Sequence, residues 1–133
     1  MNMVQFGYTI LYVTDVEKSV SFYEKSFGFS RKFVTPDNDY GELETGQTTI
    51  SFASKKLAAS NLKTGFLESN PEQKPFAIEL GLITDDVAGM VNTAIQNGAV
   101  LLEEPKEKPW GQTVAYIRDP EGFLLEICTA VNP

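Results

Sequence analysis

Histidine is absent from this 133-residue chain, and cysteine occurs once, as Cys128. Without histidine there is no Ser-His-Asp triad, no two-histidine iron site and no imidazole for acid–base catalysis. One cysteine excludes an internal disulfide framework and any zinc site built from several thiolates. These absences remove the side chains that most often carry catalysis or bind transition metals.

Positive charge is also scarce, because 11 Lys and Arg residues face 18 Asp and Glu residues, giving a formal net charge of −7. An acidic chain is a poor partner for nucleic acid or for an anionic membrane surface. No apolar run approaches the length of a membrane span, and Met1–Gly7 lacks the basic start of a signal peptide. We therefore expect a soluble, cytoplasmic protein without a nucleic-acid or membrane partner.

The chain does contain an internal repeat, which organises its two halves. Val13-Thr14-Asp15-Val16 returns 70 residues later as Ile83-Thr84-Asp85-Asp86-Val87, and a glycine follows each threonine by fourteen residues. Threonine and aspartate are typical of helix starts, and glycine is typical of helix ends. Each copy therefore predicts a strand, a helix of about three turns and a glycine stop.

Patterning around each copy predicts the remaining elements. In the first copy Asp15 caps a helix whose apolar face is Val16, Val20, Tyr23 and Phe27, and which ends at Gly28. In the second, Asp85 or Asp86 caps a helix that ends at Asn97-Gly98. Strands are expected at residues 6–13, 31–35, 40–44 and 48–54, and again at 76–84, 99–103, 112–118 and 123–129.

This order, βαβββ twice, predicts an α+β fold. We expect residues 1–54 to form the first module, 55–74 a polar linker with one short helix near Leu57–Ala59, and 75–133 the second module, within one domain overall. Two such modules side by side would form a curled eight-stranded mixed sheet around a cleft, with the helices outside. The alternative is an ordinary α+β sandwich without a shared cleft.

Two stretches carry a resemblance to a known superfamily. Tyr12–Tyr23 reads YVTDVEKSVSFY and Arg118–Ile127 reads RDPEGFLLEI. Together with the element order, they resemble the vicinal oxygen chelate superfamily, which includes glyoxalase I, bleomycin-resistance proteins, extradiol dioxygenases and fosfomycin-resistance enzymes. The resemblance specifies the fold better than the reaction, because different sites are grafted onto shared folds.

Metal-dependent members of that superfamily hold their ion with one residue on each of four strands. By resemblance these four positions fall on Tyr8, Ser51, Glu79 and Glu126, where histidine or glutamate is usual and only Glu126 keeps its type. A phenol, a hydroxyl and two carboxylates are a poor donor set for a divalent transition metal. We therefore expect no metal and no cofactor, as in the bleomycin-resistance branch, which the resemblance implies binds its drug without a metal.

Strand alternation then predicts which side chains line the cleft. If Tyr8 faces inward, so does Tyr12, and we prefer Tyr116 over its neighbours as the inward residue of its strand. Trp110 lies in the charged, proline-rich loop Glu103–Gly111, where it either stacks on a planar ligand or covers the hydrophobic core. The predicted ligand-binding residues are Tyr8, Tyr12, Ser51, Glu79, Trp110, Tyr116 and Glu126.

The role of these residues is open between several functions. The first is a binding module for a small, partly aromatic, possibly cationic molecule, with Glu79 and Glu126 as polar anchors. The second is a lyase or isomerase of the glyoxalase type, in which Glu126 or Glu79 removes a proton next to a carbonyl and Tyr8 or a metal stabilises the enolate. The third is a partner-binding domain with a vestigial cleft. The resemblance also implies a homodimer, since such proteins often complete clefts at two-fold interfaces.

Overall fold

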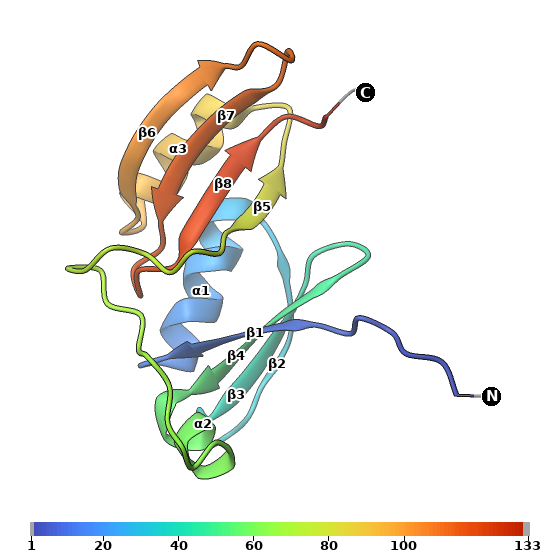
Figure 1. Cartoon of the computed structure of the whole chain (residues 1–133), viewed down its shortest axis with the longest axis vertical. Helices are drawn as coiled ribbons and strands as arrows, with labels where there is room; N and C mark the ends of the chain where they lie inside the picture. The colour runs from blue at the N-terminus through green and yellow to red at the C-terminus, as the bar shows by residue number, and fades with distance from the viewer. Residues whose placement is uncertain (1, 132–133) are drawn as a thin grey trace. The chain divides into compact units, whose positions relative to one another are not determined.

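The computed structural model describes residues 2–131 and divides into two compact units (Figure 1). Unit 1 contains the chain up to Glu24 together with Gly28–Leu67, and unit 2 contains Lys25–Phe27 together with the chain from Glu68 onward. The boundary between Leu67 and Glu68 falls inside the predicted linker 55–74. No helix in the described part of the chain is long and apolar enough to cross a membrane.

The α+β fold with a tandem βαβββ order is confirmed, and its eight strands form two four-stranded mixed sheets that do not close. Unit 1 consists of β1 (Thr9–Val13), α1 (Val16–Phe27), β2 (Ser30–Val34), β3 (Tyr40–Glu44), β4 (Thr49–Ser54) and α2 (Lys55–Asn61). Its strand order is β1-β4-β3-β2, in which β1 runs parallel to β4 and the other pairs are antiparallel.

Helix α1 begins and ends at the predicted residues. The Asp15 carboxylate accepts a hydrogen bond from the Lys18 amide at 3.2 Å, and Gly28 adopts a left-handed conformation with φ of 73°. The turn between β2 and β3 adds a second contact, because the Asn38 side chain donates to Asp15 and accepts from the Glu17 amide. The start of α1 is therefore fastened to the sheet that it covers.

The core of unit 1 lies between α1 and one face of its sheet. Tyr23 packs on Phe52 of β4 with ring centroids 5.3 Å apart, and both side chains are fully buried. Leu11 of β1 lies opposite Phe52 in the strand register and is also buried. Apolar residues of β1, β3 and β4 thus face α1, which leaves the alternate residues on the opposite face of the sheet.

Unit 2 repeats this plan. It consists of β5 (Leu80–Ile83), α3 (Val87–Gln96), β6 (Val100–Glu107), β7 (Thr113–Arg118) and β8 (Leu124–Cys128), with strand order β5-β8-β7-β6. Asp86, one of the two predicted caps, accepts a hydrogen bond from the Gly89 amide at 3.0 Å. Helix α3 covers one face of the sheet, where Leu125, Ile127 and Ile117 are fully buried (Figure 1).

Strand ends differ most from the sequence prediction at β1, β5 and β6. β1 and β5 were expected to start at residues 6 and 76 but start at Thr9 and Leu80, because the paired segments Ile50–Ser54 and Leu125–Cys128 extend no further along them. β6 runs to Glu107 and takes up most of the segment expected as a charged loop. Pro105 is tolerated there because β6 is an edge strand with shifted register on both sides of Glu103.

A buried arginine ties the linker to the β7–β8 turn within unit 2. Arg118 is 6% exposed. Its guanidinium donates to the backbone carbonyls of Gly122 at 2.9 Å, of Pro71 at 3.0 Å and of Asn70 at 3.0 Å, and it also donates to the carbonyl of Gln73. Gly122 has φ of 97°, and a Cβ built there would lie 2.8 Å from the Pro71 nitrogen. The turn therefore needs glycine both for its backbone conformation and for this close approach.

Gly122→Ala should lower the free energy of unfolding by about 1–3 kcal/mol more than Gly46→Ala. Both glycines have positive φ. Nothing lies within 4 Å of a Cβ at Gly46, so Gly46→Ala measures the cost of backbone strain alone. Chemical denaturation of the two variants checks the difference. Equal losses would show that the contact with Pro71 contributes nothing to stability.

Candidate functional site

The face of the unit 2 sheet opposite α3 carries a group of polar side chains on β7, β8 and the residue before β5. Register places Gly81, Glu126 and Tyr116 in one row across β5, β8 and β7, and places Cys128 in the next row. Leu125 and Ile127, the neighbours of Glu126, are fully buried on the other face. The alternation of β8 therefore turns the Glu126 carboxylate away from α3.

Four residues gather here, which we call the Glu126 cluster: Glu79, Tyr116, Glu126 and Cys128. The Tyr116 hydroxyl donates a hydrogen bond to Glu126 Oε1 at 3.0 Å. Glu79 directly precedes β5, and its carboxyl group interacts with that of Glu126. Among residues 2–131, neither Glu79 nor Glu126 forms an ion pair. The two acids thus lie next to each other without a cation.

Within the cluster, the pKa values of Glu79, Tyr116 and Cys128 are all raised. Partial desolvation, the nearby Glu126 charge and a hydrogen bond to Glu126 together raise the pKa of Glu79, although Glu79 is an exposed residue. Burial, followed by the hydrogen bond to Glu126, raises the pKa of Tyr116 to about 12. Burial and Glu126 likewise raise the pKa of the Cys128 thiol to about 11. The cluster therefore disfavours further negative charge, as expected where no cation offsets the carboxylates.

Unit 1 carries a second carboxylate–phenol pair, on the sheet face opposite α1. The Tyr40 hydroxyl donates to Glu42 Oε2 at 2.6 Å, and Lys32 Nζ lies 3.8 Å from Glu42 Oε1. Burial and the hydrogen bond to Glu42 raise the pKa of Tyr40 to about 12. Glu42 lies opposite Ser51 in the register, so it occupies the row that Tyr116 occupies in unit 2.

The side chain of Ser51 is fully buried in that row. Its hydroxyl has no partner with full hydrogen-bond geometry among the described residues, although it lies near enough to Tyr40 to lower the pKa of that phenol slightly. Neither Tyr40 nor Glu42 is among the site residues predicted from the sequence. The available signal was the alternation of Tyr40, Glu42 and Glu44 with Gly41 and Leu43, which places the three polar residues on one face.

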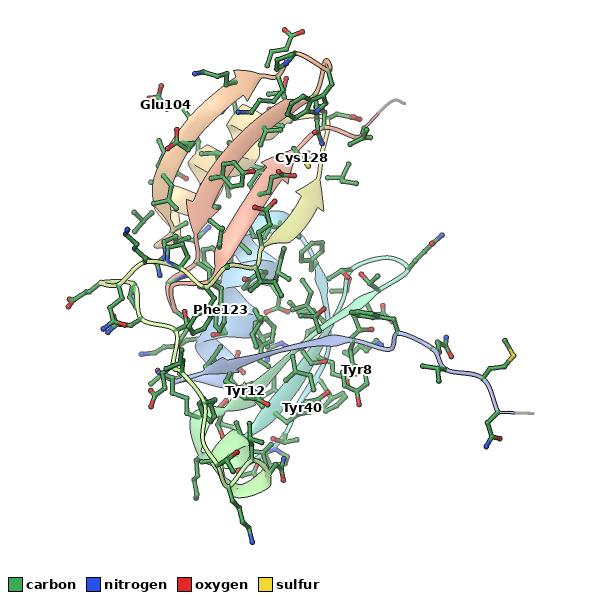
Figure 2. All side chains as sticks on the ribbon, in the orientation of Figure 1. Tyr8, Tyr12, Tyr40, Glu104, Phe123 and Cys128 are labelled. Carbon is green, nitrogen blue, oxygen red and sulfur yellow. The ribbon has the colours of Figure 1, made fainter. Side chains whose placement is uncertain are left out.

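The remaining predicted residues occupy separate places in their units. Tyr8, just before β1, is 51% exposed, and Tyr12 packs edge-on against Phe66 with ring centroids 4.8 Å apart (Figure 2). Trp110 is 62% exposed on the turn between β6 and β7, and its Nε1 donates to Gln112 Oε1 at 2.8 Å. Trp110 is therefore held on the surface and does not cover the core of unit 2. Of the seven predicted site residues, the structure brings Glu79, Tyr116 and Glu126 into one cluster.

The residues at the expected metal positions do not fit a transition metal. The four positions supply two carboxylates, one phenol and one aliphatic hydroxyl. Within residues 2–131, no group of three or more His, Cys, Asp or Glu side chains is arranged to hold a metal ion. The donor set is poor for the ions that histidine and glutamate bind in metal-dependent relatives.

Comparison with known proteins identifies the class. Residues 5–127 match the sequence model of the Glyoxalase/Bleomycin resistance protein/Dioxygenase superfamily, and the chain belongs to that superfamily. It is 28% identical over 120 residues to the uncharacterized protein YraH of Bacillus subtilis, covering 88% of this chain and 91% of that protein.

Two further matches are a second curated protein and a solved structure. A putative lactoylglutathione lyase of Brassica oleracea is 27% identical over 133 residues, covering 92% of this chain, and this chain spans only 43% of that protein. A glyoxalase-related enzyme from Fulvimarina pelagi superimposes with a TM-score of 0.81 at 20% identity, covering 96% of this chain and 89% of that chain. This structural likeness shows the shared fold.

Glu79→Gln should make the chain more stable at pH 7 but leave its stability unchanged near pH 3. Because folding raises the pKa of Glu79, the folded state binds the proton more tightly than the unfolded state. The free energy of unfolding therefore falls as pH rises through this pKa, and glutamine, which does not ionise, avoids the loss. Thermal unfolding between pH 3 and pH 8 measures the effect. Glu44→Gln, at an exposed carboxylate of unit 1, is the control, and a pH-independent difference for Glu79→Gln would contradict the assignment.

Proposed function

We propose that the protein binds a small, partly aromatic cation at the Glu126 cluster, without using a transition metal. The observation that carries this proposal is the pair of neighbouring carboxylates, Glu79 and Glu126, which has no ion-pair partner in the described part of the chain. A bound cation would relieve their repulsion and donate hydrogen bonds to them. Membership of a superfamily that includes bleomycin-resistance proteins supports a binding role.

Two aromatic side chains of unit 2 suit an aromatic ligand. The Tyr116 ring lies beside Glu126 and is held by its hydrogen bond to that carboxylate. Trp110 offers an exposed ring whose orientation is fixed by Gln112. Aromatic faces attract both planar groups and cations, so they reinforce the selection made by the two acids.

Unit 1 keeps the role predicted from the sequence, in which Tyr8, Tyr12 and Ser51 contact a ligand. Tyr40 and Glu42 join this proposal because they share the polar face of the unit 1 sheet with Ser51. A homodimer and a cytoplasmic location stay predictions, the first from the family resemblance and the second from the composition.

Benzamidinium, a planar aromatic cation, should bind, whereas its neutral isostere benzamide and the anion benzoate should not. Glu126→Gln should weaken benzamidinium binding about tenfold or more, since a hydrogen bond to a charged group contributes about 1.5–3 kcal/mol. Isothermal titration calorimetry in the presence of a chelator checks both points. Glu44→Gln is the control and should bind as the native chain does. Equal affinity for the three probes, or loss of binding on chelation, would disprove the proposal.

The same two acids also support a second candidate, a lyase or isomerase of the glyoxalase type. The raised pKa of Glu79 brings this group closer to the range of a general base at neutral pH. Either carboxylate would remove a proton from the carbon next to a carbonyl and return it to the neighbouring carbon. Names of lactoylglutathione lyases among the relatives, at low identity, agree with this candidate.

Turnover of the methylglyoxal–glutathione hemithioacetal tests this second candidate. If the protein is such a lyase, the rate should exceed the background and fall by at least a hundredfold in the Glu79→Gln, Glu126→Gln double variant, because the base is lost. A rate equal to background, or one that the double variant retains, would reject this activity while leaving the binding proposal in place.

A further inference from the structure

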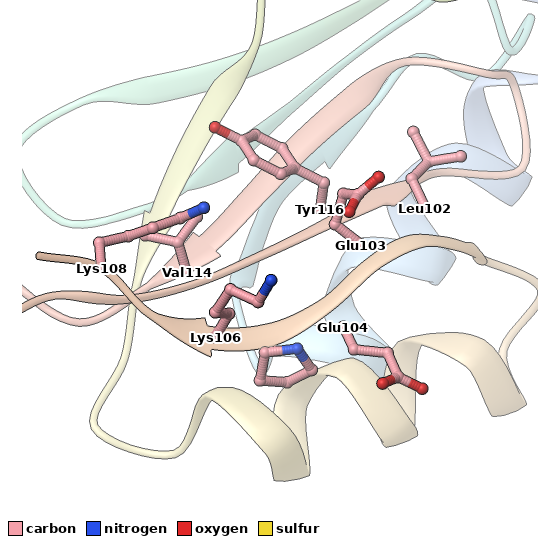
Figure 3. A pocket seen from close by; sticks show the side chains of 8 residues that line it. Leu102, Glu103, Glu104, Lys106, Lys108, Val114 and Tyr116 are labelled. Carbon is pink, nitrogen blue, oxygen red and sulfur yellow. The ribbon is translucent and has the colours of Figure 1, made fainter.

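A pocket of about 320 Å³ opens on the unit 2 sheet directly beside the Glu126 cluster (Figure 3). Its walls come from β6 and β7 and include the apolar side chains of Leu102 and Val114, the ring of Tyr116, and the charged side chains of Glu103, Lys106 and Lys108. Tyr116 belongs both to the pocket and to the cluster, since its hydroxyl donates to Glu126. The pocket and the cluster are therefore adjacent parts of one surface.

Strand register explains why these side chains share that surface. Glu103 lies opposite Tyr116, and Lys106 lies opposite Val114, while Tyr116 and Val114 lie opposite Glu126 and Cys128. Figure 3 shows Lys106, Lys108 and Glu103 extending to the side of β6 on which Tyr116 lies, whereas Glu104 extends away from it. The register shifts on both sides of Glu103 produce this arrangement, because each shift changes which side chains of β6 reach the face.

Charge is distributed unevenly across this surface. Glu103 and Glu104 line the pocket together with Lys106 and Lys108, but Glu104 extends away from the face. Neither lysine forms an ion pair within residues 2–131, so the pocket side of β6 carries two positive groups and one negative group. On the other side of Tyr116 stand the two unpaired carboxylates, Glu79 and Glu126. A ligand with charge of only one sign would be attracted by one group and repelled by the other. A zwitterion would be attracted by both.

We propose that the pocket formed by Lys106, Lys108 and Tyr116 binds the anionic group of a zwitterionic ligand whose cationic group lies at Glu126 and Glu79. The inference rests on the proposed cation-binding function and narrows its ligand class to small aromatic zwitterions. The lysines supply charge-assisted hydrogen bonds to a carboxylate or phosphate of the ligand. Leu102 and Val114, which also line the pocket, supply apolar contact to the ligand.

The test compares zwitterions with matched cations. The probes are 4-amidinobenzoate and its longer homologue 4-(4-amidinophenyl)butanoate, each paired with its primary amide, which keeps the amidinium and removes the negative charge. By isothermal titration calorimetry at constant ionic strength, at least one acid should bind about tenfold more tightly than its amide, the gain expected of a charge-assisted contact.

Variants assign this gain to the two lysines. Lys106→Ala, Lys108→Ala should reduce the ratio of acid to amide affinity to about one, with the cationic amides bound at least as tightly as by the native chain because the repulsion from the lysines is removed. Lys106→Arg, Lys108→Arg should preserve the ratio. Lys63→Ala removes an exposed charge from unit 1 and should change neither. Thermal unfolding confirms that each variant is folded.

The outcomes separate the two proposals. If the amides bind in a Glu126-dependent manner but both acids bind no better, or if the gain survives in the double alanine variant, the zwitterion inference is overturned and the cation-binding function stands. If neither benzamidinium nor the amides bind to the native chain, the proposed function fails and the inference fails with it.

Discussion

Alternation along β8 is the constraint on which the candidate site depends. Leu125 and Ile127 are fully buried on the face that α3 covers, so a strand of this pleat must direct Glu126 to the opposite face. Pairing with β5 and β7 then brings the carboxyl group of Glu79 and the hydroxyl of Tyr116 to Glu126. A shift of one residue in this register would bury the carboxylate and expose two aliphatic side chains, at a large cost in free energy.

The two units share a plan but differ in the chemistry of equivalent positions. Where unit 2 has Glu126 beside Tyr116, unit 1 has Ser51 beside Glu42, and the phenol of the unit 1 pair comes from Tyr40. Lys32 lies near Glu42 in unit 1, whereas the acids of the Glu126 cluster have no such neighbour in the described structure. The same backbone therefore sets the acid near a lysine in one unit and leaves the two acids without an ion pair in the other. This difference is why the cation site is assigned to unit 2.

Much of the fold could be predicted because its signals are local. The helix starts at Asp15 and Asp86 and the stop at Gly28 each depend on side chains within a few residues, and the structure has them as expected. Strand ends were less predictable, because the pairing partner decides them: β5 is shorter than its apolar run, and β6 continues through Pro105. The same holds for Tyr40, whose importance depends on Glu42 and on the packing of β3 against β4.

The sequence by itself determined the element order, the family resemblance, the scarcity of metal-binding donors and the two acids that have apolar neighbours along the chain. These properties follow from composition and from periodicities of two and 3.6 residues, which are readable along the chain. Only the tertiary structure decided that Glu79 and Glu126 meet without a cation, that Tyr116 joins them, and that Lys106 and Lys108 stand on the same face. Those facts depend on register between strands distant in sequence, where a shift of one residue reverses every side chain.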